Sequence, residues 1–164
     1  MTEYFNIESR YIFMTHTAIP HVTIYTDGAC KGNPGKGSWA AVLLFEKETN
    51  KLEKEISGVH AHTTNNQMEL TAVVEALKCL KQTCKVTLYS DSAYIVNAFQ
   101  QHWVENWQRN GWRTKTKEPV KNRELWETLL DLCDLHHVTF AKVKGHAGVH
   151  YNERVDELAN RALE

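Results

Sequence analysis

Four acidic residues in distinctive local settings are the strongest candidates for chemistry in this chain. Asp27 follows an apolar, β-branched run in TIYTDGACKGNPG, and Asp91 follows a second such run in VTLYSDSAYIV. Glu69 lies at the start of a helical pattern in TTNNQMEL, and Asp156 lies in the last helical pattern, HYNERVDELAN. Carboxylates are hard oxygen ligands that suit Mg²⁺ or Mn²⁺. If the four converge near His146 of VKGHAG, they suit metal-assisted hydrolysis of a phosphodiester.

Each acidic residue also has a simpler explanation, which the residues alone leave open. Asp27, followed by glycine, suits an Asx turn, and Asp91 suits a helix cap. Glu69 completes a capping box, and Asp156 resembles an ordinary solvated helix residue. Asp is nevertheless disfavoured inside strands, and two unpaired carboxylates at neighbouring strand ends repel each other. The joint occurrence of all four therefore favours a cation site.

The setting of His146 suggests a mobile imidazole. It lies between Gly145 and Gly148, where the sequence predicts a loop after a strand. Freedom to move suits a general base or a proton shuttle at a leaving group.

The elements that would position these residues follow from hydrophobic periodicity. Three strands in a meander are followed by strands that alternate with helices, which predicts an α/β fold with a mixed sheet. Asn152 is a plausible N-cap of the last helix. The predicted strands cover residues 22–26, 38–45, 51–59, 85–90 and 137–143, and the predicted helices cover 65–82, 92–101, 103–109, 124–135 and 151–163.

Length and composition indicate a single domain in a reducing compartment. The chain has 164 residues, 42% of them hydrophobic, and a net charge of −1. We expect residues 21–164 to form the domain, with residues 1–20 as an N-terminal extension of unknown role. No apolar run reaches the length of a membrane span, and the four cysteines form no C-x-x-C pair. These features predict a cytoplasmic protein without a membrane partner, and we expect it to be a monomer.

One segment is strongly basic although the whole chain is nearly neutral. Residues 108–123 have a net charge of about +5, with Glu118 as their single acidic residue. Trp103, Trp107 and Trp112 precede or enter this segment. A projecting basic element beside an acidic metal site suits an enzyme that acts on nucleic acid, with lysines on phosphates and an indole on a sugar or base.

The ordered motifs of the chain resemble those of bacterial type 1 ribonuclease H. They are TDGACKGNPG, TTNNQMEL, SDSAYIV, WVENWQRNGWRTKTKEPVKN and VKGHAGVHYNERVDELA, and the similarity spans residues 21–163. The resemblance implies an RNase H-like fold, with a five-stranded mixed sheet flanked by helices. It implies an endonuclease that hydrolyses the RNA strand of an RNA–DNA hybrid and leaves 5′-phosphate and 3′-hydroxyl ends. It also implies two Mg²⁺ ions per site, with Mn²⁺ as a substitute.

The resemblance also assigns roles to residues. It makes Asp27, Glu69, Asp91 and Asp156 the metal ligands, and His146 the mobile catalytic histidine. The surface that reads minor-groove edges and 2′-hydroxyls comprises Gly28, Ala29, Cys30, Asn33, Asn65 and Asn66. Thr64 matches a position that helps to hold a phosphate of the DNA strand. Residues 103–121 match a basic handle, whose expected substrate contacts are Trp103, Lys115, Lys117 and Lys121. Gln67 replaces a residue that is basic in many relatives, which predicts one weaker phosphate contact.

Three other functions remain open from the residues. A non-catalytic nucleic-acid-binding module could keep the fold, although the chain retains all four carboxylates and the histidine. Another nuclease on the same fold, such as a junction resolvase or a DNA exonuclease, is disfavoured by TTNNQMEL and by the tryptophan-bearing handle. A calcium-binding structural domain is disfavoured because the chain has no D-x-D-x-D-G loop.

Overall fold

A five-stranded mixed sheet forms the centre of the molecule. The structure is a computed structural model, and it describes residues 19–47, 50–143 and 145–164; nearly all of the expected extension therefore lies outside the described residues. The order along the chain is the predicted one, and it confirms the α/β fold. The elements are β1 (His21–Cys30), β2 (Gly35–Lys47), β3 (Asn50–Thr63), α2 (Asn65–Lys78), β4 (Lys85–Ser90), α3 (Ala93–Gln100), α4 (Trp103–Arg109), α5 (Arg123–Asp134), β5 (His137–Ala141) and α6 (Gly145–Ala162).

The strand register places two of the candidate aspartates side by side. The strands lie in the order β3-β2-β1-β4-β5, with β1 antiparallel to β2 and parallel to β4. Thr26 pairs with Ser90 at the last position of the β1–β4 ladder. Asp27 and Asp91 each come one residue later, so both lie at the carboxyl end of the parallel pair, where α/β sheets commonly bind ligands.

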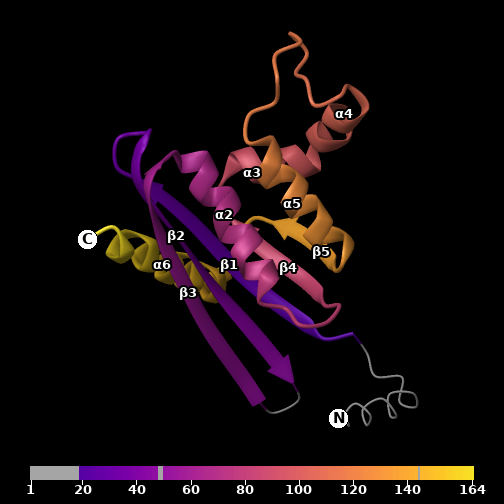
Figure 1. The fold of residues 1–164 in the computed structure, drawn as a ribbon. Helices are drawn as coiled ribbons and strands as arrows, with labels where there is room; N and C mark the ends of the chain where they lie inside the picture. The colour runs from indigo at the N-terminus through magenta and orange to yellow at the C-terminus, as the bar shows by residue number, and fades with distance from the viewer. Residues whose placement is uncertain (1–18, 48–49, 144) are drawn as a thin grey trace, which may run out of the picture.

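Helices cover both faces of the sheet, with α2 on one face and α6 on the other (Figure 1). Alternation along β1 explains this division. Val22 and Ile24 pack in the larger core with residues of α2 and α5, whereas Tyr25 packs with Val155 and other residues of α6. Both helices that carry a candidate carboxylate are therefore anchored on the strand that carries Asp27.

The segment between α3 and α5 projects away from the sheet (Figure 1). It contains the basic handle, defined as residues 103–121, which begins with α4. Among the described residues, the four non-glycine residues with positive φ all lie at the ends or turns of this segment: His102, Trp112, Lys117 and Asn122. The indoles of Trp103, Trp107, Trp112 and Trp126 form a continuous series with centroid separations of 5.4–6.3 Å. Trp126 is fully buried, so this series joins the handle to the core.

Four local predictions were wrong. Helix α6 begins at Gly145, so His146 lies in its first turn rather than in a loop, and Asn152 is an interior residue rather than the N-cap. Strand β1 continues past Asp27 to Cys30 because the antiparallel pairing with β2 extends to Gly37. Glu69 lies beyond the first turn of α2, which begins at Asn65.

Within the described residues, no helix combines the length and the apolar character that crossing a membrane requires.

Candidate active site

The four candidate carboxylates come from four different elements. Asp27 lies in β1, Asp91 directly follows β4, Glu69 lies in α2 and Asp156 lies in α6. Asp27 and Glu69 are half-buried, whereas Asp91 and Asp156 are exposed. The sheet and the two helices thus build an acidic cluster that opens to solvent on one side.

Electrostatic interactions link the carboxylates of the acidic cluster. Burial raises the pKa of Asp27 to about 7, assisted by a hydrogen bond to Asp156 and by the charges of Asp156 and Asp91. Burial raises the pKa of Glu69 to about 8, and the charges of Asp27 and Asp91 add to this shift. Both carboxyl groups thus resist ionisation at neutral pH, first because they are buried and second because the neighbouring carboxylates add negative charge.

A buried carboxylate oxygen of Glu69 lacks any partner among the described residues. Its Oε1 atom is inaccessible to solvent and makes no hydrogen bond. A buried polar atom without a partner costs free energy, and a hard cation at the cluster removes that cost. The donor set, made of oxygens with excess negative charge, fits a divalent metal ion.

Asn152 is a member of the site that the sequence interpretation missed. Its Nδ2 atom donates a 2.9 Å hydrogen bond to Oδ2 of Asp91. Asn152 lies four residues before Asp156, so both point from the same face of α6. That spacing was the available signal, but the expected helix start at residue 151 suggested a capping role instead.

The side chains of the acidic cluster do not surround a single point. In the described part of the chain, no three histidine, cysteine or acidic side chains are grouped tightly enough to hold an ion without movement. The side chain of His146 lies outside what the structure describes, although its backbone is placed in α6.

Gly28 allows α2 to lie unusually close to β1. A Cβ atom at this position would lie 2.6 Å from the backbone nitrogen of Glu69 and 2.7 Å from the carbonyl carbon of Met68. Both neighbours are backbone atoms, which cannot move independently of the helix. The glycine therefore sets how near the carboxylates of Asp27 and Glu69 can be.

A Gly28→Ala variant should lose about 1–3 kcal/mol in free energy of unfolding, because the added methyl group forces α2 away from the sheet. Urea denaturation measures this loss. Gly111→Ala is the control, since its Cβ meets nothing within 4 Å although its φ is +68°. That variant should lose only about 1 kcal/mol, from backbone strain. Equal losses would show that the close approach at Gly28 is unimportant.

The expected minor-groove surface forms one continuous area next to the acidic cluster. Oδ1 of Asn33 accepts a 2.9 Å hydrogen bond from the backbone nitrogen of Asn65, which joins the β1–β2 turn to the start of α2. Sγ of Cys30 contacts the carbonyl oxygen of Thr63 at 3.4 Å. Thr64 is the N-cap of α2, and its hydroxyl accepts from the backbone nitrogen of Gln67. Gly28 and Asn66 belong to the same two segments.

The handle residues lie apart from the cluster, on the projecting segment. Trp103 is half-buried, while Lys115, Lys117 and Lys121 are exposed. A groove of about 330 Å³ is lined by residues of α4 and the following loop, among them Trp103 and Lys115. The structure thus separates the candidate substrate contacts into two surfaces, one beside the carboxylates and one on the handle.

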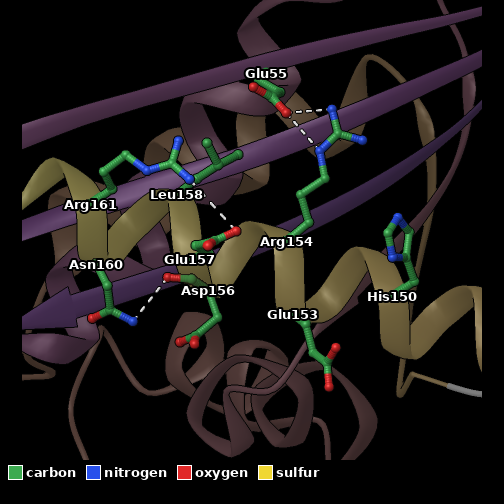
Figure 2. A pocket seen from close by; sticks show the side chains of 9 residues that line it. All are labelled: Glu55, His150, Glu153, Arg154, Asp156, Glu157, Leu158, Asn160 and Arg161. Carbon is green, nitrogen blue, oxygen red and sulfur yellow. Dashed lines mark hydrogen bonds and ion pairs between the residues drawn. The ribbon is translucent and has the colours of Figure 1, made fainter.

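A second surface cavity, of about 700 Å³, borders Asp156 along α6 (Figure 2). Arg154 points from α6 toward β3, where it pairs with Glu55 and, at 2.7 Å, with Glu53. The carboxylate of Asp156 points away from this pair (Figure 2). The arginine is therefore occupied in holding α6 against the sheet and does not neutralise the acidic cluster.

Comparison with known proteins identifies close relatives. The family model described as RNase H matches residues 20–164. The chain is 57% identical over 142 residues to a ribonuclease H of Symbiobacterium thermophilum, which covers 87% of this chain and 94% of the relative. It is 56% identical over 138 residues to a ribonuclease H of Acetivibrio thermocellus, and this alignment covers 84% of this chain and 91% of the relative.

Solved structures agree with this similarity. The chain resembles LC9-RNase H1, a type 1 RNase H, with a TM-score of 0.77 and 29% identity over 90% of this chain and 74% of that one. It also resembles LC11-RNase H1 in complex with an RNA/DNA hybrid, with a TM-score of 0.64 and 27% identity over 87% of this chain and 96% of that one.

Proposed function

The chain belongs to the RNase H family and is a nuclease that cleaves the RNA strand of RNA–DNA hybrids, and we propose that it uses divalent metal ions held by its acidic cluster. The observation that carries this proposal is the convergence of four carboxylates from β1, α2, α6 and the end of β4, with Oε1 of Glu69 buried and without a partner among the described residues. The raised pKa values of Asp27 and Glu69 support it. Carboxyl groups so arranged lower the stability of the metal-free protein, and a bound cation explains why they are kept together.

Two Mg²⁺ ions are the proposed cofactors, with Mn²⁺ as a substitute. Their ligands are the carboxylates of Asp27, Glu69, Asp91 and Asp156. Asp27 would be the central ligand of this set, since it interacts with both Asp91 and Asp156. When bound, the ions supply an activated water and stabilise the charge on the leaving 3′ oxygen. The products then carry 5′-phosphate and 3′-hydroxyl ends.

The chain's own residues orient the acidic cluster and handle protons. Asn152 holds the carboxylate of Asp91 through Oδ2, which limits its rotation. Gly28 brings Glu69 against β1. His146 has the role of moving a proton at the leaving group, and its position in the first turn of α6 puts it on the helix that carries Asp156.

Hybrid recognition is divided between the two surfaces. Beside the cluster, the proposed contacts to sugar edges and the DNA strand come from Gly28, Cys30, Asn33, Thr64, Asn65 and Asn66. RNA is distinguished from DNA by its 2′-hydroxyl, which polar side chains and backbone amides can contact. On the handle, the proposed contacts come from Trp103, Lys115, Lys117 and Lys121. The expected assembly is a cytoplasmic monomer bound to one hybrid.

Replacing Lys115, Lys117 and Lys121 together by glutamine should raise KM about tenfold and leave kcat nearly unchanged. Each lost phosphate contact should also lower the slope of log affinity against log salt by about 0.7–0.9. Cleavage kinetics between 50 and 200 mM salt measure both effects. The control replaces three exposed lysines outside the handle, Lys51, Lys54 and Lys81. An equal rise of KM in the control would indicate a general charge effect.

A cleavage assay tests the proposal directly. Labelled RNA–DNA hybrid, duplex DNA and duplex RNA are incubated with the protein, with and without EDTA. We expect cleavage of the RNA strand of the hybrid alone, abolished by EDTA and restored by Mg²⁺. Cleavage of duplex DNA would favour the other nucleases of this fold. Binding without cleavage would favour a non-catalytic module.

A further inference from the structure

A chain of side-chain hydrogen bonds runs from the end of β3 to the base of the handle. Gln67 is its centre: Oε1 accepts a 2.7 Å hydrogen bond from the hydroxyl of Thr63, and Nε2 donates a 3.2 Å bond to Oδ1 of Asn122. Nδ2 of Asn122 donates at 3.3 Å to the hydroxyl oxygen of Tyr94, which also accepts from the indole of Trp126 at 2.9 Å. These hydrogen bonds join residues that are far apart in the sequence, so they fix part of the tertiary structure.

Asn122 lies where the handle returns to the body of the protein. Its backbone is left-handed, with φ of 62°, and it directly precedes α5. It occupies the N-cap position of that helix, yet its side chain makes no capping hydrogen bond. Both ends of its amide are instead used to bind Gln67 and Tyr94. The residue therefore serves as a joint between the handle and the rest of the molecule.

Gln67 lies on the catalytic side of this joint. It is two residues before Glu69 on α2, and its backbone nitrogen is held by the N-cap Thr64. Instead of turning back to complete a capping box, its side chain reaches across to Asn122. On the far side, Trp107 of the handle packs edge-on against Trp126 at 5.4 Å. The polar bridge and the aromatic contact thus meet at the Tyr94–Trp126 pair.

We propose that Gln67 is a positioning residue that sets the orientation of the basic handle relative to the acidic cluster. The inference rests on the proposed function, in which handle and cluster engage one hybrid together. A duplex is stiff, so the surface beside the acidic cluster and the handle must both fit it at the same time. Once one surface has bound, the other binds at a high effective concentration only if the distance between the two surfaces matches the duplex. Gln67 is uncharged, and in this role it acts through its hydrogen bond to Asn122.

The central variant is Gln67→Met, which preserves side-chain length and removes both hydrogen bonds. We expect KM to rise about fivefold because the handle is less well oriented for the hybrid, with kcat within about twofold of wild type. Asn122→Gly is the second variant, since glycine keeps the left-handed backbone and deletes only the side chain. It should reproduce the same split between KM and kcat. Gln82→Ala, at an exposed turn beyond α2, is the matched control.

A double-mutant cycle separates positioning from direct contact. If Gln67 acts through the handle, Gln67→Met should raise KM no further in the Lys115, Lys117 and Lys121 triple variant. Fully additive effects would indicate direct hybrid contact and overturn the inference, as would an unchanged KM in both single variants. Affinity for labelled hybrid, measured by anisotropy in an Asp27→Asn background, gives the same comparison without turnover. Failure of the wild-type protein to cleave hybrid would instead refute the proposed function.

Discussion

Replacing Asp27 by asparagine should lower hybrid cleavage by about 1,000-fold or more, while the affinity for hybrid changes little. Asp27 interacts with all three other carboxylates of the cluster, because Asp156 and Asp91 raise its pKa and its own charge raises the pKa of Glu69. An amide keeps the shape but removes the charge that a shared cation ligand requires, and the lost transition-state stabilisation amounts to several kcal/mol. Single-turnover cleavage and anisotropy binding measure the two quantities.

Asp131→Asn provides the matched control for this experiment. Asp131 is an exposed residue of α5, so the same chemical change there should alter neither rate nor affinity. Wild-type cleavage by the Asp27→Asn variant would show that Asp27 is not a required metal ligand. A parallel loss of binding would instead indicate that Asp27 is needed for the shape of the surface.

The stability of the metal-free protein should fall as the pH rises from about 4 to 8. The pKa values of Asp27 and Glu69 are raised to about 7 and about 8 in the folded state, so the folded protein binds more protons than the unfolded chain in this window. Stability therefore decreases with pH until both groups ionise in the folded state, and it is then constant. At about 1.4 kcal/mol per pKa unit, the combined fall should amount to at least several kcal/mol, or roughly 10 °C or more in Tm.

Glu69→Gln isolates this effect from other titrations. The variant should have nearly the wild-type Tm at pH 4 but a Tm several degrees higher at pH 8 in EDTA, because its amide cannot ionise. Added Mg²⁺ should raise the Tm of the wild type and reduce the difference, since a ligand that binds only the folded state stabilises it. A constant difference between the two proteins at all pH values would mean that the charge of Glu69 is not destabilising.

The sequence was most informative where periodicity and position act together. The apolar, β-branched runs before Asp27 and Asp91 correctly indicated two strands, β1 and β4, and the register of this parallel pair places the two aspartates at adjacent positions. These features depend on local rules, so one strand or one helix turn is enough to reveal them.

What the sequence could not reveal depends on contacts between distant residues. Gln67 and Asn122 are 55 positions apart, and nothing in either neighbourhood indicates that they bond. Helix α6 begins earlier than expected, which changes Asn152 from a cap into the partner of Asp91. The steric role of Gly28 also requires the distance between α2 and β1. Each of these features arises from packing that no local propensity encodes.

The series of indoles at the handle gives the protein a built-in optical reporter. Four of its five tryptophans, Trp103, Trp107, Trp112 and Trp126, lie in one contact series that starts beside the lysine-bearing loop and ends in the core. Nucleobases that stack on an indole quench its emission, and energy passes readily between neighbouring rings. Docking of a hybrid on the handle should therefore dim the intrinsic fluorescence, so that association can be followed by stopped flow without a dye.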